Sequence, residues 1–171
     1  TITERLKNLR ILASSDFADI NSSKGKAINK VFQNKVISKI HQVTKTGISS
    51  QKKVNQDNYF IFEDFEDKAE NLFLGVCDGH GLNGHLISQT ISDNLPKILN
   101  DSILSKKLQL IMDNKKNKLI KSCEISSVEY NKIIENSFLL MNDFISQSFG
   151  NKCDLSGSTC VSLIYSPDKI I

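Results

Sequence analysis

The sequence has no long hydrophobic run and no strong excess of either charge. Its apolar runs are far shorter than the ~20 residues that a membrane-spanning helix needs, so we expect no membrane association. The formal net charge is only +3, and no basic cluster is interleaved with aromatic residues, which argues against a nucleic-acid partner. The opening residues, TITER, contain no apolar region of the kind that signal peptides have.

Paired cysteine spacing is also absent. The chain has four cysteines, Cys77, Cys123, Cys153 and Cys160, and two of them fall within expected strands. This pattern favours buried, reduced thiols over disulfides or a zinc site. We therefore expect an intracellular protein with a cytoplasmic address.

The length and composition are those of an ordinary folded domain. A chain of 171 residues suits one domain or most of one, and a chain of this size buries roughly 70% of its unfolded surface. Leucines at helical spacing predict a short helix at 3–12, and a Ser/Asp/Gly-rich stretch at 14–26 predicts a loop. Residues 27–40 fit a helix that gives way to a strand. We interpret 1–34 as a helical or linker extension.

A buried strand ends in polar residues near the middle of the chain. Residues 72–77 are nearly all apolar, the pattern of a strand buried on both faces. Asp78, Gly79, His80 and Gly81 follow directly. A carboxylate is a hard oxygen ligand, an imidazole titrates near neutrality, and glycine lets the backbone approach an ion or a phosphate closely. The stretch predicts a metal-assisted active site, provided that other carboxylates converge on it.

Strands are also expected on either side of this stretch. Residues 59–65 predict a strand, 66–71 a charged hairpin loop, and 159–165 a final strand. A final strand without a successor would be an exposed edge, which proteins avoid, so the chain looks unfinished.

Two helices are expected between the second and third of these strands. The apolar positions from Leu86 to Leu99 predict a helix that is kinked or broken at Pro96. A stretch rich in lysine and asparagine at 114–121 is expected to be exposed and mobile. Ser126 and Glu129 form a capping-box pattern that opens a second helix, with its end at 150. Strands and helices together predict an α+β layered domain.

Three strings in the chain resemble those of a known family. KVNQDNYF, GVCDGHGLNGH and SGSTCVSL occur in this order and at fitting separations. Together they resemble the N-terminal half of the metal-dependent protein Ser/Thr phosphatases, the PP2C (PPM) family, over about 39–165. The resemblance implies an α-β-β-α sandwich of antiparallel sheets flanked by helices, of which 35–171 would be the N-terminal part. It also implies hydrolysis of phosphoserine and phosphothreonine in a phosphoprotein substrate by a metal-activated water, with two Mn²⁺ or Mg²⁺ ions.

The resemblance implies roles for residues of the first two strings. Asp78 matches the aspartate that bridges the two metal ions, and Gly79 matches a glycine whose carbonyl is a ligand. His80 matches the candidate general acid, so Asp78 and His80 are the expected catalytic residues. Asp57 matches an acidic residue that supports the metal site, whereas Gln56 stands where many relatives have Glu. The alternatives are structural: a turn-initiating Asp78, a glycine needed only for its turn, and a packed histidine.

Other polar residues near these strings are weaker candidates for a functional role. Lys52 aligns with a phosphate-binding arginine of the family, and Lys53 is the neighbouring alternative. Lysine neutralises phosphate as a point charge but lacks the bidentate fork of arginine, and both lysines are equally consistent with a solvated loop. His85 is expected to pack or cap at a helix start. The SGST string, 156–159, resembles a structural corner and has no histidine placed to activate a nucleophile.

The remaining metal-binding aspartates of the family are absent from the chain, which leaves three hypotheses open. The chain is the N-terminal portion of an active phosphatase, with the missing ligands downstream. Alternatively, it is an inactive PP2C-like scaffold that docks into a larger assembly through 1–34. The third hypothesis is an unrelated hydrolase in which Asp78 and His80 act with a single metal ion.

Overall fold

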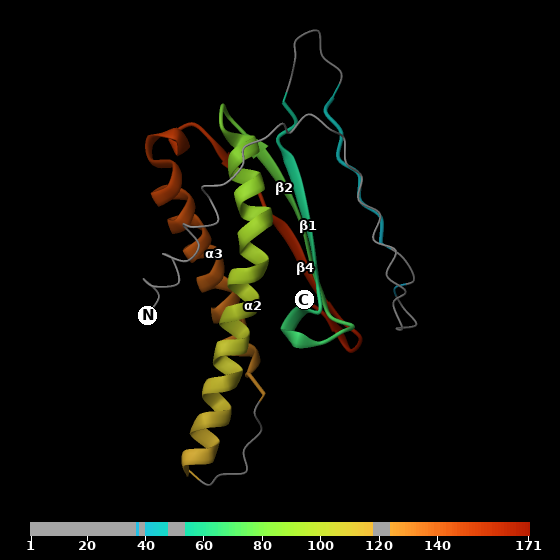
Figure 1. The fold of residues 1–171 in the computed structure, drawn as a ribbon, viewed down its shortest axis with the longest axis vertical. Coiled ribbons are helices and arrows are strands. Elements are labelled where there is room, and N and C mark those ends of the chain that lie inside the picture. Colours follow the sequence, from blue (N-terminus) through green and yellow to red (C-terminus); the bar gives the residue numbers. More distant parts are fainter. Residues whose placement is uncertain (1–36, 38–39, 48–53, 118–123) are drawn as a thin grey trace.

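The computed structural model describes residues 37, 40–47, 54–117 and 124–171 (Figure 1). The features predicted for 1–34, and most of those predicted for 27–40 and 47–53, lie outside these residues. The described elements are the strands β1 (Asp57–Glu63), β2 (Leu72–His80), β3 (Gly157–Ser158), β4 (Val161–Ser166) and β5 (Lys169–Ile170), the helices α2 (Gly84–Asn117) and α3 (Ser127–Phe149), and the 3-10 turns η1 (Phe65–Asp67) and η2 (Gly150–Cys153).

The strands form one antiparallel sheet. Its order is β1-β2-β4-β5, and the short β3 pairs with the far end of β2. The central β2 is longer than expected, because pairing with β1 and β3 carries it through Asp78 to His80. The expectation that the strand at 159–165 ends the sheet is wrong: β4 lies between β2 and β5, and Ile164 exchanges two backbone hydrogen bonds with Ile171.

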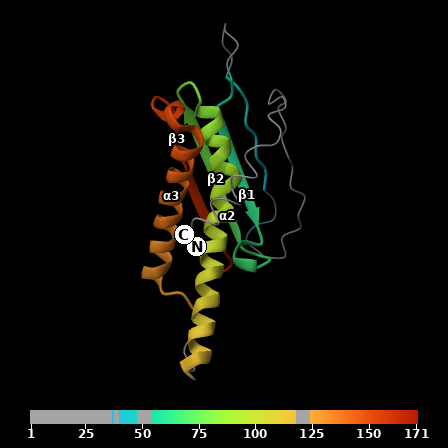
Figure 2. The ribbon, with the colours of Figure 1, turned by 60° about the vertical axis from the view of Figure 1, so that its left-hand side comes forward.

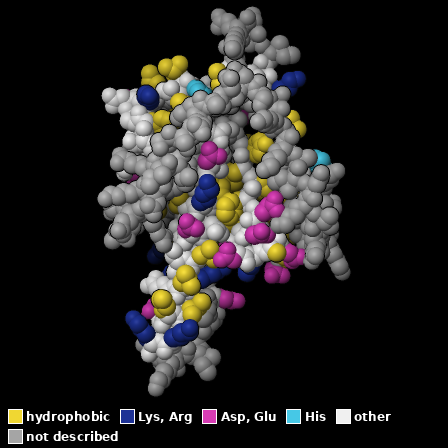
Figure 3. All heavy atoms as spheres, viewed as in Figure 1, with side chains coloured by type: hydrophobic (Ala, Val, Ile, Leu, Met, Phe, Trp, Pro, Cys, Tyr) yellow, Lys and Arg dark blue, Asp and Glu magenta, His cyan; other side chains and the backbone are white. Residues whose placement is uncertain are grey.

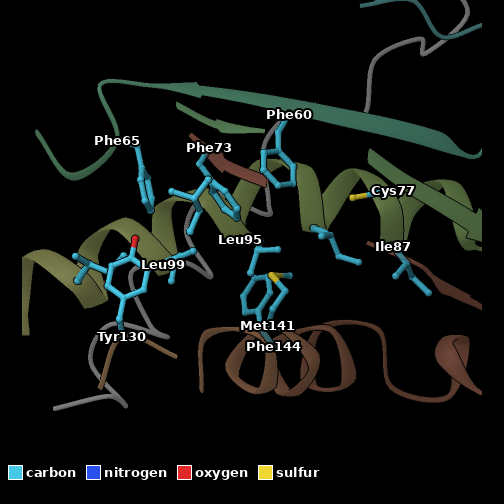
Figure 4. Packing of buried hydrophobic residues seen from close by; sticks show 13 residues of the cluster. Phe60, Phe65, Phe73, Cys77, Ile87, Leu95, Leu99, Tyr130, Met141 and Phe144 are labelled. Atoms are coloured by element: carbon cyan, nitrogen blue, oxygen red, sulfur yellow. The ribbon is translucent and has the colours of Figure 1, made fainter. Parts of the chain in front are cut away.

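Both long helices lie on the same side of the sheet. α2 runs along β1 and β2, and α3 packs against α2 (Figures 1 and 2). Side chains of alternate strand positions meet the helices there, since successive strand residues point to opposite faces. Figure 4 shows this core between the sheet and the helices. Its buried members include Phe60, Phe65, Phe73, Cys77, Ile87, Leu95, Leu99, Met141 and Phe144.

The opposite face of the sheet carries no helix among the described residues. Leu72 and Tyr165 are buried there at one end, against Ile37 and Ile40. Further along the same face, Val76, Val161 and Leu163 are exposed. The expectation that the central strand is buried on both faces is therefore wrong at this end, where only alternate residues are buried. The α+β class and the antiparallel sheet are thus confirmed, while the described part of the chain supplies one sheet and one helical layer of the four-layer sandwich.

The alternative of a break at Pro96 is wrong, and the helix extends well beyond Leu99, the last apolar position from which it was predicted. α2 is a single helix of 34 residues with Pro96 inside it. Proline in a helix interior costs about 3 kcal/mol, because it lacks an N–H and crowds the preceding turn. Leu95 and Leu99, which flank it, are 0% and 1% exposed in the core. Burial of each contributes roughly 1.5–3 kcal/mol, which offsets the penalty.

The C-terminal part of α2 extends past the sheet (Figure 1). Residues 114–117, expected to be mobile, are its last helical residues. Figure 3 shows hydrophobic side chains on this projecting part, where Leu108, Ile111 and Met112 are exposed. Even so, neither α2 nor any other helix in the described ranges is both long enough and apolar enough to span a membrane.

The capping-box prediction for α3 is confirmed. The Ser126 hydroxyl accepts a hydrogen bond from the Glu129 N–H at 3.3 Å and donates one to the Glu129 carboxylate at 3.0 Å. The helix ends where expected, at Gly150, whose φ of +52° is the left-handed conformation that glycine adopts without strain.

The turn between β1 and β2 is held by a charge network. Asp64, Glu66 and Asp67 all have positive φ, which is unfavourable for a side chain such as that of glutamate. The Glu66 carboxylate accepts hydrogen bonds from Lys107 Nζ at 2.6 Å and Tyr130 Oη at 2.5 Å. The Glu66 N–H donates to the buried Asn100 side chain at 2.8 Å. These contacts tie the turn to both helices and offset its strain.

Candidate active site

Asp57 and Asp78 lie directly opposite each other at the open end of the β1–β2 pair. The neighbouring pair, Gln56 and Gly79, is hydrogen-bonded through the Gly79 N–H at 3.1 Å. Hydrogen-bonded and non-hydrogen-bonded pairs alternate along antiparallel strands, so Asp57 and Asp78 form a non-hydrogen-bonded pair with Cα atoms about 4.5 Å apart. Both side chains belong to the face of the sheet that has no helix, and both residues are exposed.

The two carboxylates have no ion-pair partner among the described residues. No described side chain or N–H donates a hydrogen bond to either carboxylate, and neither forms an ion pair with a described cation. Like charges that face each other directly across a strand pair destabilise the sheet. A bound divalent cation would remove this repulsion, and carboxylate oxygens are the donors that Mn²⁺ and Mg²⁺ prefer.

The donor chemistry therefore fits such ions, but the number of donors is small. Within the described ranges, no group of three or more His, Cys, Asp or Glu side chains comes together as a metal site. Asp57 and Asp78, with a backbone carbonyl such as that of Gly79, form only part of a ligand set for two ions.

Gly79 is packed too closely for any side chain. A Cβ atom placed there would lie 2.4 Å from the Gly84 carbonyl oxygen and 2.6 Å from that of Gln56. These contacts press the start of α2 against the ends of β1 and β2. The absence of a side chain at Gly79 thus has a packing reason, whatever its carbonyl binds.

Gln56 faces the loop at the start of α2. Its Nε2 donates to the Gly81 carbonyl at 3.0 Å, and a Cβ added to Gly84 would lie 2.1 Å from its Oε1. Its backbone carbonyl accepts from the Ser88 hydroxyl at 2.6 Å, and Ser88 in turn accepts from Asn58 at 2.7 Å. Gln56 therefore links the strand ends to the first turns of α2. No motif in the sequence indicated the contribution of Ser88, which is buried.

His80 is exposed at the end of β2 and lies over Gly157 of β3. A Cβ atom at Gly157 would be 2.8 Å from His80 Cε1 and 2.9 Å from Nε2. Gly157 is the glycine of the SGST string, and its lack of a side chain leaves the space that the imidazole occupies. This contact explains why the string belongs to the same site as the DGHG string, from which it is distant in sequence.

Thr159, the last residue of the SGST string, holds the backbone of Asp78. Its N–H donates to the Asp78 carbonyl at 2.9 Å, and its hydroxyl accepts from the Asp78 N–H at 3.3 Å. The interpretation of the string as a structural corner agrees with these contacts, although its specific partner, Asp78, was not expected.

Several of the residues expected from the sequence line one cavity of about 290 Å³. Its wall includes Asp57, Asp78, Gly79 and His80, together with Gln56 and the segment 45–47. Asn55 ties that segment to β1 by donating to the Thr44 hydroxyl at 2.7 Å. Among the described residues of its wall, the cation is Lys45, which no motif in the sequence singled out.

The remaining residues singled out in the sequence are Lys52, Lys53 and His85. Lys52 and Lys53 are outside the described residues, so their predicted phosphate contact stays a prediction. His85 sits in the first turn of α2, as expected for a packing residue, and its Nδ1 is buried without a hydrogen-bond partner in the described part of the chain.

Comparisons with known proteins point to one class of enzyme. No family model matches the chain. It is 28% identical over 124 residues to "Probable protein phosphatase 2C 72" of Arabidopsis thaliana, covering 72% of this chain and 34% of that protein. It is 29% identical over 121 residues to "Probable protein phosphatase 2C 65" of the same plant, covering 71% and 31%.

A shorter match has higher identity. The chain is 43% identical over 49 residues to "Probable protein phosphatase 2C 14" of Oryza sativa subsp. japonica, covering 29% of this chain and 10% of that protein. In the two longer matches the chain spans about a third of the relative's length.

Proposed function

We propose that the chain belongs to the protein phosphatase 2C family and supplies the N-terminal part of a protein serine/threonine phosphatase. The substrates would be phosphoserine and phosphothreonine in phosphoproteins. The proposal rests chiefly on one observation: two carboxylates that form no ion pair within the described chain face each other and share a cavity with His80.

In this proposal, Asp57, Asp78 and the Gly79 carbonyl would hold Mn²⁺ or Mg²⁺, and carboxylates from the rest of the full-length protein would complete the ligand set. When bound, such ions lower the pKa of a coordinated water from ~15.7 towards ~7 and neutralise phosphoryl oxygens. The repulsion between Asp57 and Asp78 supports the assignment, because it gives the pair an energetic reason to bind cations.

The other residues of the cavity would act on the substrate. His80 would donate a proton to the serine or threonine oxygen as it leaves, which avoids the release of an unstable alkoxide. Its position over Gly157 keeps the imidazole at the rim of the cavity. Lys45 would attract the phosphate as a point charge, and Lys52 or Lys53 remains a further candidate for this role.

The test is hydrolysis of a phosphoserine peptide by the full-length protein, with and without Mn²⁺ or Mg²⁺. We expect metal-dependent hydrolysis that falls by at least about 100-fold in Asp78→Ala, since even indirect support of a metal site is worth about 10- to 100-fold. Asp143→Ala, which removes an exposed carboxylate from α3, is the matched control and should retain the full rate.

Equal rates from Asp78→Ala and the wild-type protein would refute the catalytic role of Asp78. A full-length protein that binds Mn²⁺ without hydrolysing any phosphopeptide would favour the inactive scaffold instead. The proposed docking of 1–34 into a larger assembly is tested separately, by deleting these residues and measuring co-purification with partners.

A further inference from the structure

Cys77 and Cys160 face each other across the sheet, immediately beside Asp78. β2 pairs with β3 and with β4 in one continuous register, from His80 opposite Gly157 to Leu72 opposite Tyr165. The hydrogen bond from the Thr159 N–H to the Asp78 carbonyl shows that the register does not slip between the two short ladders. Continuing this register places Cys160 directly opposite Cys77.

The position suits a disulfide. Since Asp78 and Thr159 occupy a hydrogen-bonded position, Cys77 and Cys160 occupy a non-hydrogen-bonded one, where the Cα atoms are about 4.5 Å apart. Disulfides join residues whose Cα atoms are about 4.4–6.8 Å apart. Both side chains belong to the helix-facing cluster, in which Cys77 is buried and the partly buried Cys160 packs against the buried residues. All described cysteines are free thiols.

One of the two thiols is accessible to a small molecule. Cys77 is 0% exposed, as its place in the core of Figure 4 indicates. Cys160 is partly exposed and lines a second cavity, of about 490 Å³, beside His80 and Ser158. An oxidant the size of hydrogen peroxide can enter such a cavity and reach the Cys160 sulfur, whereas the Cys77 sulfur is shielded.

We propose that Cys77 and Cys160 are a peroxide-responsive pair that closes to a disulfide beside the active site. Hydrogen peroxide oxidises the Cys160 thiol to a sulfenic acid and is reduced to water. The Cys77 sulfur then attacks the Cys160 sulfur, an S–S bond forms, the S–O bond breaks, and the hydroxide leaves with the Cys77 proton as a second water. Intracellular disulfides of this kind are typically transient and redox-sensing.

The bond would act on the residues next to it. Cys77 precedes Asp78, and Cys160 follows Thr159, which holds the Asp78 N–H and carbonyl. Closing the S–S bond would change the local geometry of the two strands at this register and so shift the Asp78 carboxylate relative to Asp57. This consequence rests on the proposed phosphatase function, whereas formation of the disulfide does not.

The first experiment treats the full-length protein with hydrogen peroxide, blocks the remaining thiols with an alkylating reagent, and maps the peptides by mass spectrometry. We expect a cross-linked peptide pair that contains Cys77 and Cys160, with two hydrogens fewer than the separate peptides, and its disappearance after dithiothreitol. The pair should form equally in Cys153→Ser, which keeps both sulfurs, and should be absent from Cys160→Ser and Cys77→Ser.

Over-oxidation of Cys160 with Cys77 recovered as an alkylated thiol would overturn the proposal, as would a disulfide that joins either residue only to Cys123. Because Cys77 is in the core, Cys77→Ser could fail to fold, and the more exposed Cys160→Ser then carries the comparison. Both outcomes are read by mass and do not depend on phosphatase activity.

The second experiment measures metal-dependent hydrolysis before and after oxidation. We expect a fall of about tenfold or more that dithiothreitol reverses, because a displacement of about 1 Å near the chemistry can reduce a rate about 100-fold. Cys160→Ser should keep its rate in peroxide. Disulfide formation without any change in a measurable rate would refute the regulatory consequence, and absence of hydrolysis in the reduced protein would instead count against the proposed function.

Discussion

The carboxylates at the two ends of the β1–β2 pair differ in burial and in their charged partners. At the turn end, the Glu66 carboxylate is largely buried, forms an ion pair with Lys107 and accepts a hydrogen bond from Tyr130. At the open end, Asp57 and Asp78 are exposed, face each other, and have no cation partner among the described residues. The first arrangement stabilises the fold. The second lowers its stability, and a bound cation would relieve the repulsion between the two carboxylates. Comparing them separates carboxylates that build the protein from carboxylates available to a ligand.

Removing the cation at the turn end should have the largest effect on stability. Lys107→Met leaves the Glu66 carboxylate largely buried without its ion pair, and we expect a loss of about 2–3 kcal/mol in the free energy of unfolding. The matched control is Lys106→Met, which breaks the exposed pair with Glu129 at 2.8 Å and should change little. Chemical denaturation of the full-length protein measures both, and similar losses would mean that burial does not distinguish the two pairs.

Displacing His80 at the open end should affect catalysis and leave the fold intact. Gly157→Ala places a methyl group against the imidazole, which is exposed and can rotate away. We expect kcat to fall about 10- to 100-fold with little change in KM, since general acid catalysis contributes about 10²–10⁴-fold. Gly47→Ala, on the wall of the same cavity but with open space around its Cβ, is the control. Equal kcat values for the two variants would argue against His80 as the proton donor.

The turn end should also contribute an acid-sensitive part of the stability. Burial raises the pKa of Glu66, but hydrogen bonds from Lys107 and Tyr130 outweigh it, so the pKa is below the ordinary value of 4.5. A carboxyl group with a lowered folded pKa stabilises fully above its unfolded pKa and loses that contribution as the pH falls through the folded value. The stability difference between wild-type and Lys107→Met should therefore be constant well above pH 4.5 and shrink below it. Denaturation curves across this range provide the test, and a difference that grows on acidification would contradict it.

Removing one charge at the open end should have the smallest effect, and the opposite sign. Without divalent ions, Asp57→Asn should raise the free energy of unfolding by about 0.2–1 kcal/mol, because it relieves the repulsion with Asp78. Added Mn²⁺ should raise the melting temperature of the wild-type protein more than that of the variant. A destabilised Asp57→Asn protein would show that the two carboxylates do not repel each other.

Local patterns were sufficient for several features of the fold. The capping box at Ser126, the stop at Gly150 and the buried strand that leads to Asp78 depend on neighbouring residues, so periodicity and residue type predict them. Pro96 shows where local reasoning fails: its penalty is local, but the burial of Leu95 and Leu99 that outweighs it is tertiary. The strand β5 was missed because only pairing with β4 distinguishes it from a loop.

The residues of the candidate site also divide into those that local patterns predict and those that they do not. Motifs singled out Asp57, Asp78 and His80, but not Lys45, Ser88 or the contact between His80 and Gly157. The missed features come from segments that pack against the strand ends from elsewhere in the chain. No local pattern records such contacts.

The amino-acid sequence by itself determined where a carboxylate, a glycine and an imidazole would follow a buried strand, since that depends on the order of adjacent residues. Only the tertiary structure decided that Asp57 lies opposite Asp78 and Cys77 opposite Cys160. These pairings depend on strand register, which is set over long separations by the turn that Glu66 anchors and by the packing of α2 and α3. A shift of one residue in either register would move every side chain to the other face of the sheet.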